Sequence, residues 1–314
     1  MTLVTSFPQR ALRPIRRRLG RGVDQLRAAR ASVRLLHPPG HYYSPLPSLK
    51  EIKARRAILW PEPPPSTLGG IDTRDADQLL LVSELARFHD DQPFGDEPGA
   101  NRYGFRNDFY GPAEGIVLYC MLRHLRPSRV VEVGSGFSSA LMLDTRDRHL
   151  TDIDFTFIEP SPATLQRLLT KQDRADMRLL VKQVQDVPLD VFSQLGAGDI
   201  LFIDSSHQMK LGSDVNDLLF RVLPALERGV YVHFHDIAWP FEYPQQYAMR
   251  GGAWNEAYAL HAFLQYNNRF EIALWPGYLE HFHRAELGAA LPLALTPPPH
   301  DPTLGSGAIW LRSG

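Results

Sequence analysis

Residues 130–136 read VVEVGSG, and they are the strongest local indication of the fold class. The short run of β-branched residues predicts a buried strand. The glycines that follow predict a tight turn into a helix beginning near residue 138. Because glycine has no Cβ, its backbone can come close to a ligand, and the N–H groups at the start of the next helix point into the same crevice. We expect a ligand at Gly134, Ser135 and Gly136.

Short apolar strands alternate with helices on both sides of this turn, which predicts an α/β fold with a parallel sheet covered on both faces. Strands are expected at 129–133, 155–158, 178–184, 199–203, 230–234, 270–275 and 307–312. Helices are expected at 75–88, 114–125, 138–145, 161–171, 215–227 and 255–266. The proline-rich piece 277–305 is expected to cross the surface.

The chain of 314 residues divides into three parts by composition. We expect a basic arm at 1–45, a cap of helices and loops at 46–111, and the α/β domain at 112–314. The first 36 residues hold nine arginines and one acid, Asp24. This arm is read as a solvated tail, as a contact with an anionic membrane surface or an acidic partner, or as an organelle transit peptide.

Charge and cysteine content exclude several other classes. A formal net charge of -1 argues against a nucleic-acid partner. The single cysteine, Cys120, excludes an internal disulfide and a cysteine-based zinc site. No apolar run has the roughly 18 residues of a membrane span, and a secretory signal is not expected. We expect a cytoplasmic protein, at the inner membrane surface if the arm contacts lipid, and the oligomeric state is left open.

Two acids favour one class of nucleoside ligand. Glu159 ends the second strand, where a carboxylate can accept hydrogen bonds from ribose hydroxyls, as in dehydrogenases and methyltransferases alike. The glycine motif of a dinucleotide site, G-x-G-x-x-G, has a third glycine, but Ser139 stands at that position. Glu132, just before the turn, would repel a pyrophosphate and suit a cation. S-adenosylmethionine carries a sulfonium and an amino group and has no phosphate, so it is the expected cofactor.

These residues resemble the class I S-adenosylmethionine-dependent methyltransferases, most of all the bacterial enzymes that methylate sugars and other small hydroxylated molecules. The resemblance rests on residues 132–136, on Glu159 and on Phe202-Ile203-Asp204. It implies a Rossmann-like sheet of seven strands in the order 3-2-1-4-5-7-6. It also implies that Glu132 and Gly134 hold the amino acid end of the cofactor, Glu159 the ribose and Asp186 the adenine. A helix cap is the alternative role for Asp186.

Polar clusters end the fourth and fifth strands, at residues 204–207 and 233–236. His207 is the expected base for a hydroxyl acceptor, since a neutral imidazole titrates near neutral pH; a hydrogen bond within the loop is the alternative. Asp204 and Asp236 could bind Mg²⁺ or another divalent metal, although metal-dependent relatives carry acidic or amide ligands where His235 and Ile237 stand. Without a metal, the two acids would satisfy backbone donors and orient the imidazoles.

Aromatic residues and carboxylates follow the fifth strand and suit an acceptor site. The expected acceptor contacts are His235, Trp239, Tyr243, Trp254 and Glu256; the alternative is a loop packed on the sheet edge. The expected reaction is methyl transfer to a hydroxyl of a small molecule, with a sugar or glycosylated metabolite as candidate. An NAD-type oxidoreductase and a non-catalytic Rossmann scaffold are the rival readings.

Overall fold

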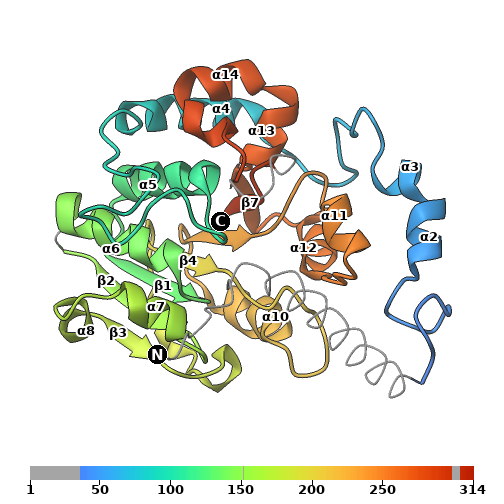
Figure 1. Ribbon diagram of the computed structural model, residues 1–314, viewed down its shortest axis with the longest axis horizontal. Coiled ribbons are helices and arrows are strands. Elements are labelled where there is room, and N and C mark those ends of the chain that lie inside the picture. Colours follow the sequence, from blue (N-terminus) through green and yellow to red (C-terminus); the bar gives the residue numbers. More distant parts are fainter. Residues whose placement is uncertain (1–35, 151, 299–304) are drawn as a thin grey trace, which may run out of the picture. The chain divides into compact units, whose positions relative to one another are not determined.

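The computed structural model describes residues 36–150, 152–298 and 305–314 (Figure 1). The chain forms two compact units, 1–59 and 60–314. The described part of the first unit holds helices α2 (Leu49–Ala54) and α3 (Arg56–Leu59). Ser48 caps α2 by accepting a hydrogen bond from the Glu51 N–H, and the Glu51 carboxylate accepts one from the Ser48 N–H. Most of the basic arm expected at 1–45 lies outside the described residues, so its membrane contact stays a prediction.

The second unit is built on one seven-stranded sheet with the order β3-β2-β1-β4-β5-β7-β6 (Figure 1). Strands β1 to β5 run parallel, and β7 lies antiparallel to both of its neighbours. This confirms the expected fold class and strand order. The strands are β1 (Arg129–Val133), β2 (Asp154–Ile158), β3 (Arg178–Leu180), β4 (Ile200–Ile203), β5 (Tyr231–His235), β6 (Phe270–Leu274) and β7 (Ala308–Ser313).

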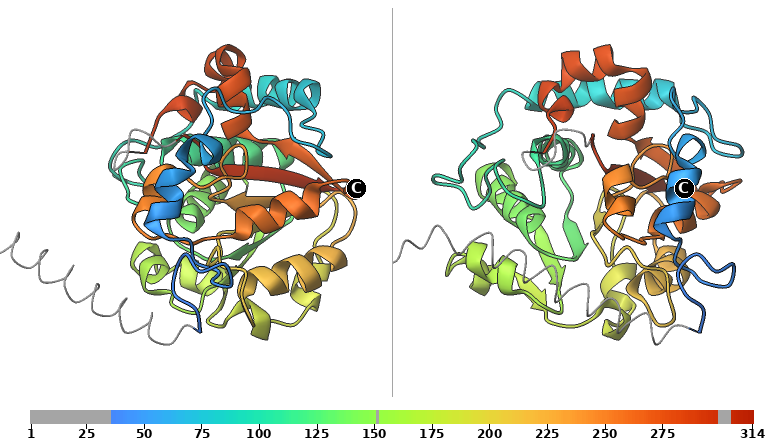
Figure 2. Two further views of the ribbon diagram at one scale, coloured as in Figure 1. Left: turned by 90° about the vertical axis from the view of Figure 1, so that its right-hand side faces the viewer. Right: turned by 45° about the vertical axis from the view of Figure 1, so that its right-hand side comes forward.

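Both faces of this sheet are covered. Successive side chains of a strand point to opposite faces, and every residue of β4 is buried, as are the last four of β1 and of β5. The right-hand view of Figure 2 shows the sheet between a helical layer with α5 (Pro112–Leu125) and α6 (Phe137–His149) and another with α10 (Asp214–Asp217) and α12 (Glu256–Leu264). Continuous apolar strands are therefore the consequence of burial on two sides.

Several predicted helices are shorter or more broken than expected. The helix expected at 215–227 is α10 followed by the π turn η4 (Leu218–Val222) and the 3₁₀ turn η5 (Leu223–Ala225), with Pro224 inside the last turn. Proline has no N–H to continue the ladder of hydrogen bonds. The remaining helices are α4 (Asp75–Leu85), η2 (Ala86–Phe88), α7 (Ala163–Leu168), α8 (Asp173–Asp176), η3 (Val184–Asp186), α9 (Asp190–Ser193) and α11 (Gln245–Met249).

The expectation that 277–305 simply crosses the surface is wrong for its first half. This segment holds α13 (Pro276–Phe282), α14 (Arg284–Ala290) and η6 (Pro292–Leu295). Its buried leucines, Leu279, Leu287 and Leu291, pack into the core. The prolines misled the prediction because Pro276 and Pro292 stand at the first positions of helices, where a missing N–H costs nothing.

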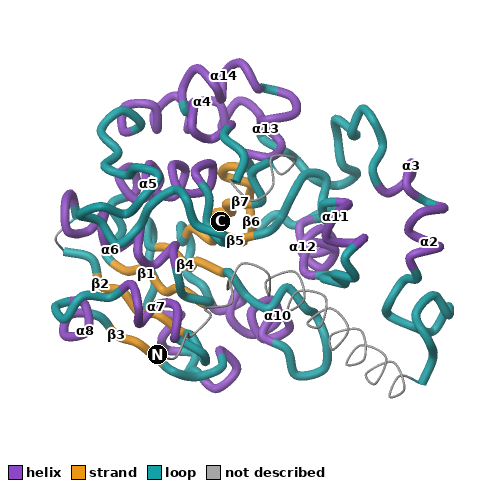
Figure 3. The backbone as a smooth tube through the Cα atoms, viewed as in Figure 1, coloured by secondary structure: helices purple, strands orange, loops and turns teal. Residues whose placement is uncertain are grey.

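A long loop over residues 89–111 joins η2 to α5 and is drawn in teal in Figure 3. It is anchored by Tyr103, which is fully buried and whose hydroxyl donates to the carbonyl of Tyr110. This anchoring carries Asp108 and Phe109 to the edge of the sheet where the strands end. Among the residues that the structure describes, no helix is both long and apolar enough to cross a membrane.

Candidate functional site

The carboxyl ends of β1, β4 and β5 line up at one edge of the sheet. In register, Val133 pairs with Ile203, and Ile203 pairs with Phe234. The residues that leave these strands are therefore neighbours in space although they are far apart in the sequence. Ligands of open α/β sheets bind at this edge, and two cavities open here, which we call the donor cavity and the acceptor cavity.

The donor cavity has a volume of about 430 Å³ and follows β1, β2 and β4. Gly134 lines it with a φ of 82°, a conformation that L side chains rarely adopt. A Cβ at this position would overlap the carbonyl oxygen of Asp204, so only glycine lets the two strand ends approach. The cavity is lined by Val133, Gly134, Ile158, Glu159, Pro160, Gln183, Val184, Gln185, Asp204, Ser205, Ser206, Lys210, Gly212, Ser213 and Asp214.

Glu159 is the predicted donor contact that the structure places most clearly. It lines the donor cavity, and its carboxylate accepts hydrogen bonds from the backbone N–H groups of Ser135, at 3.2 Å, and Ser161, at 2.6 Å. The backbone thus fixes this carboxylate at the cavity wall. Asp186 ends the 3₁₀ turn η3 and does not line the cavity; its neighbours Val184 and Gln185 do.

Glu132 faces away from the donor cavity. Its side chain is fully buried and accepts hydrogen bonds from the hydroxyls of Ser138, at 2.5 Å, and Ser139 in the first turn of α6. Burial raises the pKa of Glu132 to about 8, although those hydrogen bonds favour the ionised form. Gly136 and Ser135 likewise shape the turn without lining the cavity. The contact of Glu132 with a cationic ligand therefore stays a prediction.

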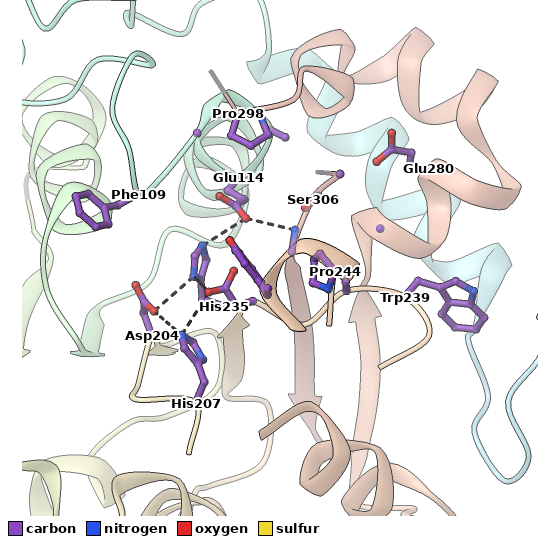
Figure 4. Close-up of a pocket in the computed structure, with 18 of the residues that line it drawn as sticks. Phe109, Glu114, Asp204, His207, His235, Trp239, Pro244, Glu280, Pro298 and Ser306 are labelled. Atoms are coloured by element: carbon purple, nitrogen blue, oxygen red, sulfur yellow. Dashed lines mark hydrogen bonds and ion pairs between the residues drawn. The ribbon is translucent and has the colours of Figure 1, made fainter. Parts of the chain in front are cut away.

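The acceptor cavity has a volume of about 570 Å³, and Figure 4 shows the side chains that line it. Its walls carry the carboxylates of Asp108, Glu114, Asp204, Asp236, Glu242 and Glu280. No lysine or arginine is present among its described lining residues. Phe109, Trp239, Tyr247 and Trp254 supply aromatic surface. Asp204 lines both this cavity and the donor cavity, so it marks the place where they meet.

A cluster of carboxylates and imidazoles lies at this junction, and we call Asp204, His207, His235 and Asp236 the junction cluster (Figure 4). The Nε2 atom of His207 lies 3.5 Å from Asp204 Oδ1 and 3.4 Å from Asp236 Oδ2. The Nδ1 atom of His235 lies 3.4 Å from Asp204 Oδ1 and 3.7 Å from Asp236 Oδ2. Two nitrogens and two carboxylates thus surround one point.

Two further acids support the cluster from behind. Glu256, the first residue of α12, is buried and lies 2.8 Å from Nδ1 of His207. Glu114, in the first turn of α5, has Oε1 at 3.3 Å from Nε2 of His235. In each histidine, one ring nitrogen therefore points into the junction cluster, and the other faces the carboxylate of Glu256 or Glu114.

The carboxylates hold both imidazoles in the protonated form when no other cation is present. Burial opposes the charge on His207, but Asp204, Glu256 and Asp236 outweigh it and raise the pKa of His207 to about 10. Burial also opposes the charge on His235, and Asp236, Asp204 and Glu114 raise its pKa well above the ordinary value. Burial disfavours ionised Asp204, yet His235 and His207 lower its pKa. The carboxylates therefore stabilise a positive charge within the junction cluster, such as a proton on each imidazole.

Two of the six described non-glycine residues with positive φ belong to the junction cluster. His207 and Asp236 have φ values of 56° and 57°, in the left-handed region that residues other than glycine rarely adopt. Such strain costs of order 1–3 kcal/mol per residue and persists where surrounding contacts fix it. Backbone N–H groups of Asn255 and Glu256 donate to the carbonyl oxygen of His207 and hold its loop in place. Strain retained at a cavity junction is typical of functional sites.

The predicted acceptor contacts divide into two groups. His235, Trp239 and Trp254 line the acceptor cavity. Tyr243 and Glu256 do not: the Tyr243 hydroxyl accepts a hydrogen bond from the N–H of Ala257, and Glu256 contacts His207 and Ser205. These two residues fix the start of α12 and the histidine loop.

Sequence reasoning missed Glu114 and Glu280, which also line the acceptor cavity, whereas Glu242 belongs to the carboxylates expected after the fifth strand. Glu114 stands at the start of an apolar helix, where an acid is expected for the helix dipole alone. Glu280 lies in the segment that was taken for a surface crossing. The only available signal was an acid in the first turn of α5 after a Gly-Pro pair, and it does not point to His235, which is 121 positions away in the sequence.

Comparison with known proteins places the site within one family model. Residues 131–237 match the model described as a methyltransferase domain. This range contains Glu132, Gly134, Glu159 and the whole junction cluster. A protein of Archaeoglobus fulgidus, described as uncharacterized, is 31% identical over 165 residues, which are 51% of this chain and 74% of that protein.

Solved structures with a similar course of the chain include an apo-structure of CmcI, with 19% sequence identity, a TM-score of 0.41, and coverage of 65% of this chain and 72% of that one. The O-methyltransferase TomG from Streptomyces achromogenes, in complex with SAM, has 15% sequence identity and a TM-score of 0.39. That match covers 62% of this chain and 80% of TomG.

Proposed function

Because the chain belongs to the class I S-adenosylmethionine-dependent methyltransferases, we propose that it transfers the methyl group to a hydroxyl oxygen of a small molecule held in the acceptor cavity. S-adenosylmethionine is the methyl donor. The observation that carries the choice of acceptor is Asp204, which lines both cavities beside two imidazoles and a second carboxylate. An oxygen nucleophile placed at this junction would face the methyl carbon of a donor in the neighbouring cavity.

We propose that the donor lies along the ends of β1 and β2. Its ribose hydroxyls would donate to Glu159, which is already fixed by two backbone N–H groups. The adenine would lie along Val184 and Gln185, next to the predicted contact Asp186. The amino acid end would approach the backbone at Gly134, where the absence of a Cβ leaves room.

The reaction requires one bond to form as another breaks. The acceptor oxygen attacks the methyl carbon, the carbon–sulfur bond breaks, and S-adenosylhomocysteine leaves with the electron pair. The hydroxyl proton passes to a base as the new bond forms. Alignment of the three reacting atoms supplies a large part of the rate enhancement, and the shared wall at Asp204 supports such an alignment.

Two residues compete for the role of base. His207 is the candidate from the sequence, but both of its nitrogens face carboxylates: Nδ1 faces Glu256, and Nε2 faces Asp204 and Asp236. This geometry favours a positioning role for His207. Asp236 and His207 both line the acceptor cavity, but carboxylates face both nitrogens of His207, and we propose that the Asp236 carboxylate accepts the proton. Replacement of each residue by a neutral isostere of similar size would separate the two roles.

We propose that a divalent cation binds at the junction cluster; the sequence indicated Asp204 and Asp236 as its ligands. Asp204, His207 and His235 offer ligand atoms that all lie within 4.8 Å of one another, and Asp236 is adjacent. Bound there, a cation would lower the pKa of the acceptor hydroxyl and fix its orientation. The residues of this chain would hold the acceptor next to the donor cavity whether or not the ion contributes to the rate.

The lining of the acceptor cavity points to a hydroxylated acceptor without negative charge. Six carboxylates line the cavity, and no lysine or arginine does so among its described residues. A phosphate or carboxylate group would be repelled, whereas hydroxyl groups can donate to carboxylates. Phe109, which is exposed, and Trp254, which is only partly buried, offer faces on which a sugar or another ring can pack. The Trp239 ring is instead packed against Trp275 and Tyr278. A neutral sugar or a glycosylated metabolite, or an amino-bearing relative of either, satisfies both requirements.

The test is a donor-binding titration followed by a methyl-transfer assay. Calorimetry should detect binding of S-adenosylmethionine. Nicotinamide dinucleotides should not raise the temperature at which the protein unfolds. Tritiated donor should label neutral hydroxylated acceptors in preference to their phosphorylated counterparts. Donor binding without transfer to any acceptor would favour the non-catalytic reading, and protection by a dinucleotide alone would contradict the proposal.

A further inference from the structure

We infer that the junction cluster is a site for a first-row transition-metal ion of the Zn²⁺, Co²⁺ or Mn²⁺ kind, bound by His207 Nε2, His235 Nδ1 and the Asp204 carboxylate. The sequence suggested Mg²⁺ or another divalent metal on Asp204 and Asp236. Magnesium prefers six oxygen ligands, most of them water or carboxylate. Two imidazoles in the ligand set instead favour a transition metal. The inference deepens the proposed function, but it does not depend on the identity of the acceptor.

The distances in the cluster fit a metal better than hydrogen bonds. The two contacts of Asp204 Oδ1 with the imidazole nitrogens measure 3.5 and 3.4 Å. Hydrogen bonds to nitrogen are mostly 2.7–3.2 Å long, so these atoms are too far apart to bond well. Ligands placed roughly 2.1 Å from a tetrahedral ion are separated by about 3.4 Å. The spacing is therefore that of neighbouring ligands around one ion.

His235 gives an independent sign that a partner belongs here. Its side chain is 93% buried, and neither ring nitrogen makes a well-formed hydrogen bond with a described residue; the ion-pair partners Asp204 and Glu114 lie 3.4 and 3.3 Å away. A buried polar group without a well-formed hydrogen bond is costly and calls for an explanation. Figure 4 shows the ring directed between Asp204 and Glu114, with one nitrogen toward each. An ion bound at Nδ1 would remove this cost.

The carboxylates behind the imidazoles match the usual support of metal-binding histidines. Such histidines donate their second ring N–H to a carboxylate, which fixes the tautomer and increases the basicity of the ligand nitrogen. Glu256 stands 2.8 Å from Nδ1 of His207, and Glu114 stands 3.3 Å from Nε2 of His235. Two histidines from different strand ends share this arrangement, and in both cases the remaining nitrogen faces the cluster.

The rings themselves are restrained by aromatic neighbours. The His207 ring contacts Trp254 with centroids 4.9 Å apart, and the His235 ring contacts Tyr110 at 5.5 Å. Rotation of either imidazole out of the cluster would lose these contacts. A site whose ligands are held before the ion arrives loses less conformational entropy on binding. Asp236 completes the set as a carboxylate within 3.4 and 3.7 Å of the two nitrogens.

Metal binding by the full chain tests the inference directly. Protein stripped with a chelator should bind one Zn²⁺ or Co²⁺ per chain in calorimetric titrations. Mg²⁺ should bind at least 100-fold more weakly. Bound Co²⁺ should show visible absorption bands typical of mixed nitrogen and oxygen ligands. Tighter binding of Mg²⁺ than of Zn²⁺ and Co²⁺, or more than one equivalent without a preferred first site, would overturn the inference.

Variants locate the ion. His235→Ala and His207→Ala should each weaken Co²⁺ binding at least 100-fold, and Glu256→Gln should weaken it about 10- to 100-fold through the ligand that it supports. His281→Ala is the matched control, because it removes an imidazole that lines the same cavity outside the cluster. His235→Asp should restore a ligand and shift the preference toward Mg²⁺. Equal Co²⁺ affinity in His281→Ala and His235→Ala would overturn the inference.

Donor binding measured on the same samples separates this inference from the proposed function. Each variant should retain its circular dichroism spectrum and bind S-adenosylmethionine, because neither histidine lines the donor cavity. Donor binding without metal binding would overturn the metal site and leave methyl transfer standing. Metal binding without donor binding would overturn the proposed function and leave the metal site standing.

Discussion

The donor and acceptor cavities meet at Asp204 but are built in opposite ways. The donor cavity is lined mostly by the turns that follow β1, β2, β3 and β4, and its acid Glu159 is bound by the backbone N–H groups of Ser161, two positions away, and Ser135, 24 positions away. The acceptor cavity draws residues from position 108 to position 307, and its charged side chains face one another. The donor cavity thus depends mainly on turns at the strand ends and on backbone groups, whereas the acceptor cavity depends on side chains that the tertiary fold brings together.

The difference indicates which structural features donor binding and turnover depend on. A site made by a local turn can be kept by any sequence that keeps the turn, whereas a site made by distant side chains changes with a single substitution. Donor binding should therefore depend on backbone geometry, and turnover should depend on the side chains at the junction. Four predictions test this difference between the donor cavity and the acceptor cavity.

The largest effect is expected at Asp204, the residue shared by the two cavities. Asp204→Asn keeps the size of the side chain but removes the charge that faces His207 and His235. We expect turnover to fall about 10²- to 10⁴-fold, the range of a lost catalytic proton-transfer or orienting group. The affinity for S-adenosylmethionine should change less than about tenfold, a bound set by the loss of one hydrogen bond.

Asp214→Asn is the matched control, because Asp214 lines only the donor cavity and accepts hydrogen bonds from the backbone and hydroxyl of Ser206. It should affect donor affinity more than the rate of the bound complex. Single-turnover assays and donor calorimetry on both variants provide the measurement. If Asp204→Asn kept its turnover, the junction would not be the reaction site.

The next effect is expected at the turn of the donor cavity. Gly134→Ala places a Cβ against the carbonyl of Asp204 in a backbone with φ of 82°. Positive φ alone costs of order 1–2 kcal/mol, and the overlap adds to it. Gly198→Ala is the control, since Gly198 has φ of 87° with open space around a Cβ. We expect the first variant to lose more unfolding free energy in urea than the second. Equal losses would show that close approach of the strands does not matter.

The same division explains how much could be predicted from the sequence. The periodicity of apolar residues gave the α/β class, and β1 was predicted at its observed bounds, because a buried parallel strand followed by glycines has a local signature. The position of Glu159 just after β2, on the wall of the donor cavity, was predicted for the same reason, and its contact with a ribose stays a prediction. The pairing of Glu256 with His207 and of Glu114 with His235 has no local signature, since it depends on how α12 and α5 pack against the sheet.

Glu132 shows the limit of charge arguments from sequence. An acid beside the glycine turn was expected to face a cationic ligand, but the strand turns it toward α6, where Ser138 and Ser139 satisfy it. Side chains alternate across a strand, and the choice of face is made by the packing of the next helix. The fold was predicted correctly, and the contact of Glu132 with a cationic ligand stays a prediction.

The third prediction concerns the effect of Glu132 on the pH dependence of the free energy of unfolding. Burial raises its pKa to about 8 from an ordinary value of 4.5. Between these values the folded protein holds a proton that the unfolded chain releases. The contribution of Glu132 to stability is therefore present below pH 4.5 and is lost as the pH rises through 8, by at most about 1.4 kcal/mol per pH unit.

Glu132→Gln cannot titrate, so its unfolding free energy should decline less steeply than that of the wild type between pH 4.5 and 8. Glu97→Gln, which alters an exposed acid paired with Arg106, is the control and should leave the slope unchanged. Urea unfolding at a series of pH values provides the slopes. Parallel curves for wild type and Glu132→Gln would mean that Glu132 is ionised in the folded protein and that the interior of the turn is more polar than the contacts indicate.

The smallest effect is expected at the rim of the acceptor cavity, where charge selects the acceptor. Glu280 lines the cavity and also pairs with Arg284. Removal of one charge roughly 8 Å from an acceptor in water-like surroundings changes its binding free energy by about 0.5 kcal/mol, or about twofold. Glu280→Gln should therefore lower KM for a phosphorylated acceptor about twofold and leave KM for the neutral acceptor unchanged.

Glu286→Gln is the control, because it removes the same charge from α14 outside the cavity lining, and it should alter neither KM value. The twofold change should disappear in high salt, since exposed charges are then screened. A change that persists in high salt would assign Glu280 to shape rather than charge, and the acceptor cavity would then select its ligand by fit, as the donor cavity does.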